Sequence, residues 1–386
     1  MSNVPKLRFK EFSGEWEEKQ LGKIATFYNS KRIPLTEIDR IKGEYPYYGA
    51  SGIIDYVKDY IFDGEYILLG EDGANIVMRN SRLVFLAKGK FWVNNHAHIF
   101  QAKDSNSFLC EALERINYTK YNTGTAQPKL NSDVVKKIKL LLPSKQEQEK
   151  IASFLTSVDT KIEQLTKKEE LLSSYKKGVM QKIFNQEIRF KADDGRAFCE
   201  WDEKKLGDLT KIVVGGTPST TNDEYWTNGT VNWLSSGDIN NGIIKKSSKM
   251  ITELGLLKSS AKLMPKDTVV LAITGATLGR IGYLDIETSG NQSVAGMIPN
   301  SKFEAKFLFY TLQKNTNTIL SMAGGAAQAG INKATIESLE FSFPCLEEQT
   351  KIANFLSSID SKIEQVQQHL NSTKEFKKAL LQQMFV

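Results

Sequence analysis

The sequence predicts an α+β protein built as a tandem repeat, in which a mixed α/β section and a long helix follow one another twice. The first observation is a nearly duplicated helical segment, "EQEKIASFLTSVDTKIEQL" from Glu147 and "EQTKIANFLSSIDSKIEQV" from Glu348, offset by 201 residues (348 − 147). The second is a shared entrance, "EWEEKQLGKI" from Glu15 and "EWDEKKLGDL" from Glu200, offset by 185 residues (200 − 15). The copies therefore differ in length by 16 residues (201 − 185), all of them between entrance and helix.

A third pair of matching segments closes each section before its helix. These segments are "GTAQPKLN" from Gly124 and "GAAQAGIN" from Gly325, which share the offset of 201 residues. A proline, Pro143 or Pro344, then keeps a preceding strand from continuing and marks the start of the helix. The predicted boundaries are a first section at 1–143, a helix at 144–186, a second section at 187–344 and a helix at 345–386.

Each section has the pattern of short strands separated by Gly, Asn, Asp and Ser turns, followed by a helix. Apolar β-type runs lie at 65–70 and 267–274, and helices are expected near 107–118 and 304–314. The sections resemble each other only at their ends. We therefore expect two α+β domains with different loops.

The two repeated helices carry the heptad pattern of a coiled coil. Each is about 38 residues long, which corresponds to about 57 Å at about 1.5 Å per residue. The first copy loses its register near Glu169, and packing of each helix on its own domain remains the alternative. The expected seam consists of Ile151, Leu155, Val158, Ile162, Leu165, Leu172, Tyr175, Val179 and Ile183 in the first copy and of Ile352, Leu356, Ile359, Ile363, Val366 and Leu370 in the second.

Composition sets broad limits on the class of protein. A chain of 386 residues suits two or three domains. Its net charge of +6, from 51 basic and 45 acidic residues, is compatible with a polyanionic partner without establishing one. No apolar run approaches the roughly 18 residues of a membrane span, and the N-terminal residues lack the apolar core of a secretory signal. We expect a cytoplasmic protein.

The three cysteines, Cys110, Cys199 and Cys345, are odd in number and far apart. We interpret them as reduced thiols that pack in the interior. Neither they nor the three histidines show the spacing of metal ligands. No metal site is expected.

Amide, hydroxyl and aromatic residues are concentrated in the candidate loops, as in "GEYPYYGASG", "WVNNHAH", "GGTPSTTNDEYWTNG" and "WLSSGDINNG". Such side chains can bond to base edges, and nearby Lys and Arg can hold phosphates. Ordinary solvated loops are the alternative for any single residue. The candidates for DNA contact are Lys31, Arg32, Tyr47, Tyr48, Arg79, Arg82, Lys88, Asn94, Asn95, His96, Gln127, Thr217, Ser219, Trp226, Ser235, Ser236, Thr274, Thr277, Arg280, Asn291, Gln292 and Gln328.

Motifs for catalysis are missing from the sequence. There is no GxxxxGK[ST] phosphate loop, and no two prolines are adjacent, which excludes an Asn/Asp-Pro-Pro-aromatic motif of amino-methyltransferases. "GATLGRIG" from Gly275 is interpreted as a turn. Asp194 with Glu203-x-Lys205 loosely fits a nuclease pattern, but these residues lie at a domain entrance, so we favour a structural role. We expect no catalytic residues.

The chain resembles the specificity subunits of type I restriction-modification systems. The resemblance covers essentially the whole chain and rests on the "EW…LG" entrances, the two exits and the "P…EQ.KIA.FL…D.KIEQ" block that follows each section. It implies two target-recognition domains, each reading one half of a bipartite double-stranded DNA target, and two long helices that lie antiparallel and set the spacing of the half-sites. It also implies that the chain has no chemistry and binds no cofactor of its own.

The resemblance further implies assembly with two adenine methyltransferase subunits, which bring S-adenosylmethionine, and with restriction translocase subunits, which use ATP and Mg. Charged residues that recur on both helices are the candidates for docking the methyltransferases. A coiled-coil scaffold without DNA specificity, or a stand-alone methyltransferase or nuclease, remains the alternative. The docking candidates are Asp159, Glu163, Lys176, Lys177, Asp360, Glu364, Lys377 and Lys378.

Overall fold

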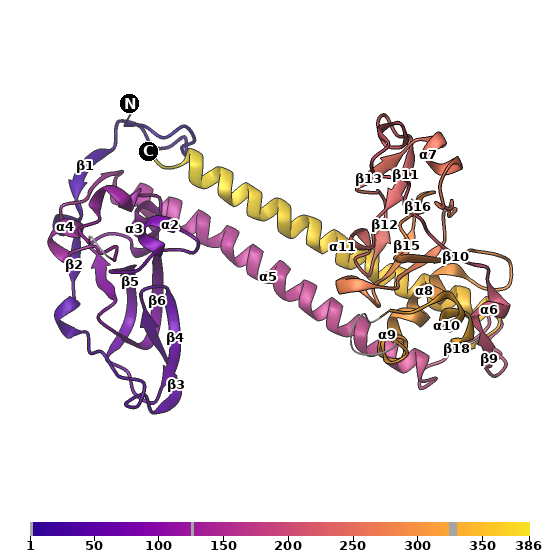
Figure 1. The fold of residues 1–386 in the computed structure, drawn as a ribbon. Coiled ribbons are helices and arrows are strands. Elements are labelled where there is room, and N and C mark those ends of the chain that lie inside the picture. The colour runs from indigo at the N-terminus through magenta and orange to yellow at the C-terminus, as the bar shows by residue number, and fades with distance from the viewer. Residues whose placement is uncertain (1–2, 125–126, 324–329) are drawn as a thin grey trace. The chain divides into compact units, whose positions relative to one another are not determined.

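The computed structural model describes residues 3–124, 127–323 and 330–386, and its two most extended elements are the helices α5 and α11 (Figure 1). Helix α5 spans Lys145–Phe184 (40 residues) and α11 spans Leu346–Gln383 (38 residues), which confirms both predicted helices. The chain divides into two compact units. The first unit is Met1–Lys167 with Gln368–Val386, and the second is Lys168–Gln367, so each unit contains part of both helices.

The described residues of the first unit form eight strands and four short α-helices before α5. Its strands are β1 Glu17–Gln20, β2 Ala25–Phe27, β3 Lys42–Gly49, β4 Gly52–Val57, β5 Phe62–Gly70, β6 Val84–Val93, β7 Ala97–Ala102 and β8 Lys139–Leu142. Its short helices are α1 Leu21–Ile24, α2 Asn75–Met78, α3 Asn106–Glu114 and α4 Ser132–Lys136.

The second unit contains additional strands and helices, and the central strands of its main sheet are shorter than those of the first unit. Its strands are β9 Asp202–Lys205, β10 Ile212–Val214, β11 Val231–Leu234, β12 Ile243–Ile244, β13 Lys249–Ile251, β14 Val269–Ala272, β15 Ile281–Leu284, β16 Ser289–Gly290, β17 Val294–Met297 and β18 Glu340–Phe343. Its short helices are α6 Leu206–Leu209, α7 Glu253–Leu257, α8 Ala305–Lys314, α9 Thr316–Ser321 and α10 Lys333–Ser338.

The main sheets of the two units share one topology, although their sequences do not match. The strand order is β2-β7-β5-β6-β3-β4 in the first unit and β10-β17-β14-β15-β12 in the second. Both sheets contain a parallel pair at the same place, β3 with β6 and β12 with β15. The second unit adds a three-stranded sheet, β13-β11-β16. The two mixed α/β domains of the predicted fold class are confirmed.

In each section, the first strand, which follows the entrance tryptophan, pairs with the last strand, which precedes the long helix. Strand β1 is antiparallel to β8, and β9 is antiparallel to β18, so each section closes on itself before its helix begins. Strands β8 and β18 end at Leu142 and Phe343, immediately before Pro143 and Pro344, as the prolines predict.

Close packing explains the repeated Leu-Gly of the entrance. Leu21 and Leu206 are fully buried. A Cβ on Gly22 would lie 3.1 Å from Cβ of Lys136, and a Cβ on Gly207 would lie 3.1 Å from Cβ of Glu337. The glycine therefore lets the first short helix of the section approach the helix that precedes the exit strand.

The entrance tryptophan of the first unit packs against the end of α11. The ring of Trp16 makes edge contacts with Phe108 of α3 and with Phe385, and the Phe108 and Phe385 rings stack with centroids 5.2 Å apart. Phe385 and the preceding Met384 are buried. The last residues of the chain thus complete the core of the first unit.

The second unit repeats this triad with the end of α5. Trp201 contacts Phe184 and Phe307, whose centroids lie 5.5 Å apart. Phe184 lies 201 residues before Phe385 in the sequence (385 − 184). The core of the first unit therefore includes residues at the end of α11, and the core of the second unit includes residues at the end of α5.

Helices α5 and α11 run antiparallel, as expected. In the second unit, Glu169 accepts a hydrogen bond from Gln367 at 2.7 Å, and Lys176 forms an ion pair with Asp360 at 2.6 Å. Residue numbers rise along α5 while they fall along α11. The seam residues are largely buried, but Tyr175 is 53% exposed, so its assignment to the seam is wrong.

The repeated Glu-Gln at the start of each helix ties the helix to its own unit. In the first unit, Nε and Nη2 of Arg8 each lie 2.7 Å from a carboxylate oxygen of Glu147, whose side chain is 1% exposed. This bidentate bond and the charge of Glu147 raise the pKa of Arg8. Gln148 donates to the carbonyl of Pro143 at 3.1 Å.

The second unit repeats this clamp. Arg189 bonds to Glu348 at 3.1 and 2.8 Å, and the indole of Trp201 donates to the same carboxylate at 3.2 Å. Gln349 donates to the carbonyl of Pro344 at 2.8 Å. The block that carries the family resemblance therefore has a structural role.

We expect Glu147→Ala to lower the free energy of unfolding of the first unit by about 3 kcal/mol, because it leaves a largely buried guanidinium without its counterion. Glu163→Ala on the same helix is the matched control, since its side chain is exposed. Urea unfolding followed by circular dichroism measures both. Equal unfolding midpoints for the two variants would contradict the role of the clamp.

The interpretation of the cysteines is only partly correct. Cys110 is buried, and burial raises its pKa to about 12. Cys345 is half-buried. Cys199 is exposed, because it lies in the irregular segment before β9, so a packing role for it is wrong.

Candidate nucleic-acid interface

The loops after β10, β11, β14 and β16 meet at one edge of the second unit, and we call them the second loop cluster. Backbone bonds hold them together, since the amide of Gly216 donates to the carbonyl of Gly290 at 2.8 Å and the amide of Asn291 donates to that of Leu234 at 2.8 Å. Thr217 donates to the side chain of Gln292 at 2.6 Å. Predicted DNA contacts that are far apart in sequence are thus brought together.

Glycine is required where these loops touch. A Cβ on Gly215 would lie 2.1 Å from the carbonyl oxygen of Gly290, and a Cβ on Gly216 would lie 2.2 Å from Oγ of Ser260. Both distances are far shorter than any real contact. Gly215 therefore allows the β10 loop to lie directly on the β16 loop, and Gly216 allows it to lie against Ser260.

Hydroxyl groups and one arginine extend this cluster. Thr274 donates to Ser293 at 2.6 Å, and Gly275 has a φ of +74° that favours glycine, which confirms the predicted turn. Thr277 is half-buried. Arg280 is exposed, and its guanidinium makes a long contact of 3.5 Å with the carbonyl of Ile239.

Trp226 positions the long β10–β11 loop. Its indole nitrogen donates to the carbonyl of Ser219 at 3.0 Å, and its ring contacts Trp233 edge-on. The ammonium of Lys249 lies 5.8 Å from the ring centroid of Trp226. The ring is half-buried, so it supports the loop while part of its edge remains accessible.

A carboxylate that the sequence analysis did not select lies in the same cluster. Asp238 accepts bonds from the backbone and hydroxyl of Ser235, at 2.7 and 2.8 Å, and from Ser248 at 2.9 Å. The neighbouring Ser236 is half-buried. A carboxylate can accept a bond from the amino group of cytosine. A search for basic and amide residues alone misses Asp238.

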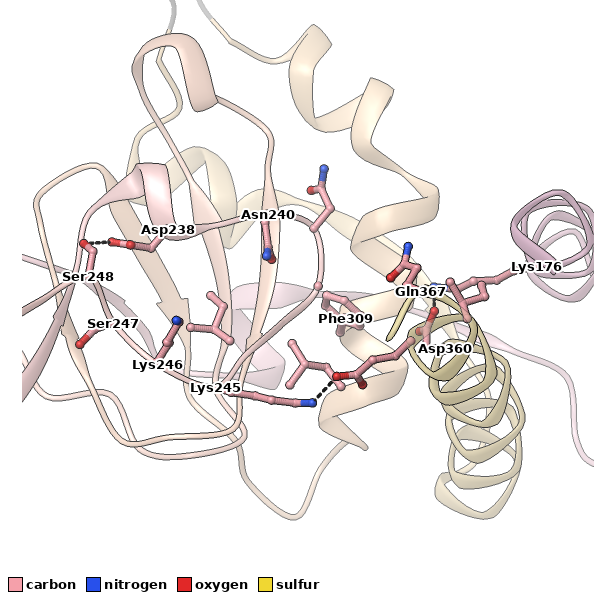
Figure 2. A pocket seen from close by; sticks show the side chains of 16 residues that line it. Lys176, Asp238, Asn240, Lys245, Lys246, Ser247, Ser248, Phe309, Asp360 and Gln367 are labelled. Carbon is pink, nitrogen blue, oxygen red and sulfur yellow. Dashed lines mark hydrogen bonds and ion pairs between the residues drawn. The ribbon is translucent and has the colours of Figure 1, made fainter. Parts of the chain in front are cut away.

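Asp238 also lines a pocket of about 810 Å³, shown in Figure 2. Lys176 lies beside Asp360 in this pocket, and Lys245 bonds to Glu364 of α11 at 2.7 Å. The loop between β11 and β13 is thereby tied to the helix.

The corresponding loops of the first unit form the first loop cluster, around residues 29–32, 71–73, 94–96 and 127–130. They follow β2, β5 and β6, and the amide of Leu130 donates to the carbonyl of Glu71 at 2.7 Å. Strands β2 and β5 hold the same places in the sheet as β10 and β14. Two loops of the first loop cluster therefore follow strands that are equivalent to those of the second, whereas the β11 and β16 loops belong to the additional sheet of the second unit.

Arg32 and His96 of this cluster already have acidic partners. Arg32 is 13% exposed and bonds to Glu71 at 2.7 Å and to the carbonyl of Ala97 at 2.7 Å. Nδ1 of His96 lies 2.8 Å from Asp72. Arg32 holds the loops together, whereas the half-exposed His96–Asp72 pair faces solvent. Asp72 is a second carboxylate that the sequence search missed.

His98, the neighbour of His96 in the "NNHAH" stretch, has a packing role. It is fully buried. Its Nδ1 lies 2.9 Å from the side-chain amide nitrogen (Nδ2) of Asn29, and its Nε2 lies 2.7 Å from the carbonyl oxygen of Leu130. Because an amide nitrogen donates, Nδ1 accepts and Nε2 donates. Burial lowers the pKa of His98, which favours this neutral form.

The remaining candidates of the first unit differ in exposure. Tyr47 and Asn94 are buried, so the structure gives their side chains packing roles. Tyr48 is half-buried against Phe85. Lys31, Asn95 and Gln127 are exposed at the first loop cluster, whereas Gln328 of the second unit lies outside the described residues.

Three basic candidates are held by acids of their own unit. Arg79 pairs with Glu114 at 2.7 Å, Arg82 with Glu111 at 2.9 Å and Lys88 with Glu65 at 2.9 Å. The two arginines contact α3 and Lys88 belongs to β6, so these residues do not join the first loop cluster. Their contact with DNA stays a prediction.

Comparison with known proteins gives the family. A family model described as the type I restriction modification DNA specificity domain matches residues 13–173 and 199–374. The chain belongs to this family. A type I restriction enzyme specificity subunit from Haemophilus influenzae is 26% identical over 90% of this chain and 88% of that protein. One from Methanocaldococcus jannaschii is 26% identical over 97% and 94%.

A solved specificity subunit shares the fold of this family member. The crystal structure of the S subunit of a type I restriction-modification system from M. genitalium matches with a TM-score of 0.70 at 17% identity, over 99% of both chains. In the part of the present chain that the structure describes, no helix is long and apolar enough to cross a membrane. Nor do the described residues contain a group of three or more His, Cys, Asp or Glu side chains suited to a metal ion.

Four of the docking candidates pair across the two helices. Asp159 bonds to Lys377 at 2.7 Å in the first unit, and Lys176 bonds to Asp360 at 2.6 Å in the second. Tyr310 also donates to Asp360, at 2.7 Å. When two copies of one helix pair antiparallel, Asp of each copy meets Lys of the other. The recurrence of these four residues therefore has a structural explanation, and their role in docking stays a prediction.

The other four docking candidates do not pair across the two helices. Glu163 and Lys177 are exposed, and Lys378 is exposed with Glu375 at 3.9 Å. Glu364, the repeat equivalent of Glu163, bonds to Lys245. The two equivalent acidic positions thus have different surroundings.

Proposed function

We propose that this chain reads DNA sequence for a type I restriction-modification complex, with each unit recognising one half of a bipartite double-stranded target. The observation that carries the proposal is that two sheets with five strands in the same order present different polar loops, including those that follow the equivalent strands β2 and β10 and the equivalent strands β5 and β14. A constant scaffold with variable loops suits recognition of two different short sequences.

Exposed side chains of the two loop clusters are the proposed contacts. Amide side chains such as those of Asn95, Gln127 and Gln292 can bond to base edges, and Lys31 and Arg280 can bond to phosphates. The paired residues Arg32, Trp226 and Ser235 would hold the loops in place. The remaining candidates are proposed to support these contacts from the loops and strands around them.

The chemistry would belong to the partners. We propose that two adenine methyltransferase subunits supply S-adenosylmethionine, and that translocase subunits supply ATP hydrolysis with Mg, in the cytoplasm of a prokaryote. The chain itself would bind no cofactor and act as a non-catalytic subunit. Exposed charges on the helices, including Glu163, Lys177 and Lys378, are proposed to contact the methyltransferases.

Methylation mapping tests the proposal. Cells that express the cognate methyltransferase with this chain should carry adenine methylation at one bipartite sequence, and cells that lack the chain should lose it at every such site. Salt-sensitive binding of the assembled complex to a duplex of that sequence is the companion measurement. Unchanged methylation without the chain would contradict a role in specificity.

A further inference from the structure

Two aromatic side chains are exposed at equivalent positions of the repeated helices. Tyr175 of α5, in the second unit, is 53% exposed, and Phe376 of α11, in the first unit, is 51% exposed. They are 201 residues apart (376 − 175), which is the offset of the helix repeat. We infer that Tyr175 and Phe376 are equivalent anchors by which the chain binds two copies of one partner protein.

Neighbouring residues fix the direction of these aromatics. Each precedes a lysine that bonds across the helix pair, Lys176 to Asp360 and Lys377 to Asp159. Successive residues of an α-helix point about 100° apart. Tyr175 and Phe376 therefore flank the seam and point out of it, each onto the outer surface of its own unit.

An aromatic at both positions is unusual because its surroundings differ between the copies. Leu171 is replaced by Ser372 one turn before the aromatic, and Ser174 is replaced by Glu375 directly before it. Single exposed apolar residues are common and need no explanation. A large exposed ring is present in both copies although these two nearby positions differ, which favours a shared contact.

The flanking residues indicate the chemistry of the partner. Tyr175 lies between Lys168 and Lys182, and Phe376 lies between His369 and Gln383, each about two helical turns away. All four flanking side chains are exposed and can donate hydrogen bonds. We call each aromatic with its two flanking residues a stripe. Such a stripe fits an apolar pocket whose rim carries carboxylates or other acceptors. Aromatic residues at the centre of a contact, with polar residues around them, are typical of binding hot spots.

Because the chain carries two equivalent stripes, it suits a partner protein of which two copies bind. This inference rests on the proposed function, in which two identical methyltransferase chains assemble with each specificity subunit. Each stripe would hold one methyltransferase copy, Tyr175 on the second unit and Phe376 on the first. Because both rings are already exposed, their removal should leave the fold intact.

The test is the number of cognate methyltransferase chains bound, measured by native mass spectrometry of the full-length complex. We expect two copies for the wild type, one for Tyr175→Ala, one for Phe376→Ala and none for the double variant, with at least a tenfold loss of affinity for each missing copy. Tyr175→Phe should retain two copies. Tyr56→Ala is the matched control, since Tyr56 is 50% exposed on β4, away from the helices.

Two results would overturn the inference. If the double variant unfolds at the wild-type temperature and still binds two copies, the anchors are refuted while the proposed function stands. If the wild type binds no methyltransferase, the proposed partnership fails and the inference fails with it.

Discussion

Exchange of residues 17–142 for the corresponding segment of another family member should change one half of the methylated sequence and leave the other half intact. The segment closes on itself, because its first strand, β1, pairs with its last strand, β8. Glu17 lies opposite Leu142 and Gln20 lies opposite Lys139. All residues of the first loop cluster lie inside it. Its ends leave the Arg8–Glu147 clamp in place.

The structure sets the boundaries of this exchange. Trp16 has to be kept, because it contacts Phe385 at the end of α11. The donor has to supply an aromatic residue at Phe108, which stacks on the same ring. Exchange of residues 202–343, from β9 to β18, is the reciprocal replacement and should change only the other half-site. Methylation mapping decides both, and a change in both halves from one exchange would refute independent reading.

Insertion of one heptad into each helix should lengthen the unread gap by about three base pairs or abolish DNA binding. Seven residues add about 10 Å at about 1.5 Å per residue, which is about three base pairs at about 3.4 Å each. Because α5 and α11 are continuous helices that contribute to both units, they are proposed to set the spacing of the half-sites. Three extra base pairs also rotate one half-site by about 100° relative to the other, at about 10.5 base pairs per turn. If the lengthened helices do not follow this rotation, the two units cannot contact both half-sites at once, and DNA binding is lost.

The antiparallel register gives the insertion points. Asp159 faces Lys377. Because the helices are antiparallel, the residue five positions after Asp159, Gln164, faces the residue five positions before Lys377, Ser372. Insertions after Gln164 and after Asn371 are therefore opposite one another and keep the seam in phase. A seven-residue insertion after Glu37, in the exposed segment before β3, is the control and should not alter the gap. Recovery of both original half-sites at the original gap would show that the helices do not set the spacing.

The sequence alone determined the plan of the chain. Heptad spacing, prolines and internal matches predicted two helices, and the predicted ranges 144–186 and 345–386 extend past the observed helices by one residue at the start and by two or three at the end. The entrances and exits marked where each section begins and ends. These features are predictable because they depend on neighbours a few residues apart, where helical periodicity and the fixed φ of proline act directly.

Candidate contact residues were only partly predictable. The polar loops of the second unit do converge, yet Arg79 and Arg82 bond to carboxylates of α3 and Tyr47 is buried. Residue type indicates what a side chain can bind. It does not indicate whether a carboxylate of the same unit is close enough to bind it first.

Tertiary structure alone decided which parts of the chain complete one another. The shared sheet order of two dissimilar sections, the contact of Trp16 with Phe385 and the pairing of Asp159 with Lys377 all join residues that are distant in sequence. No local pattern encodes such contacts, because each of them requires segments that are distant in sequence to pack together in the folded chain. Antiparallel packing of the two helix copies gives the repeated Asp and Lys residues structural roles that recurrence in the sequence could not distinguish from docking.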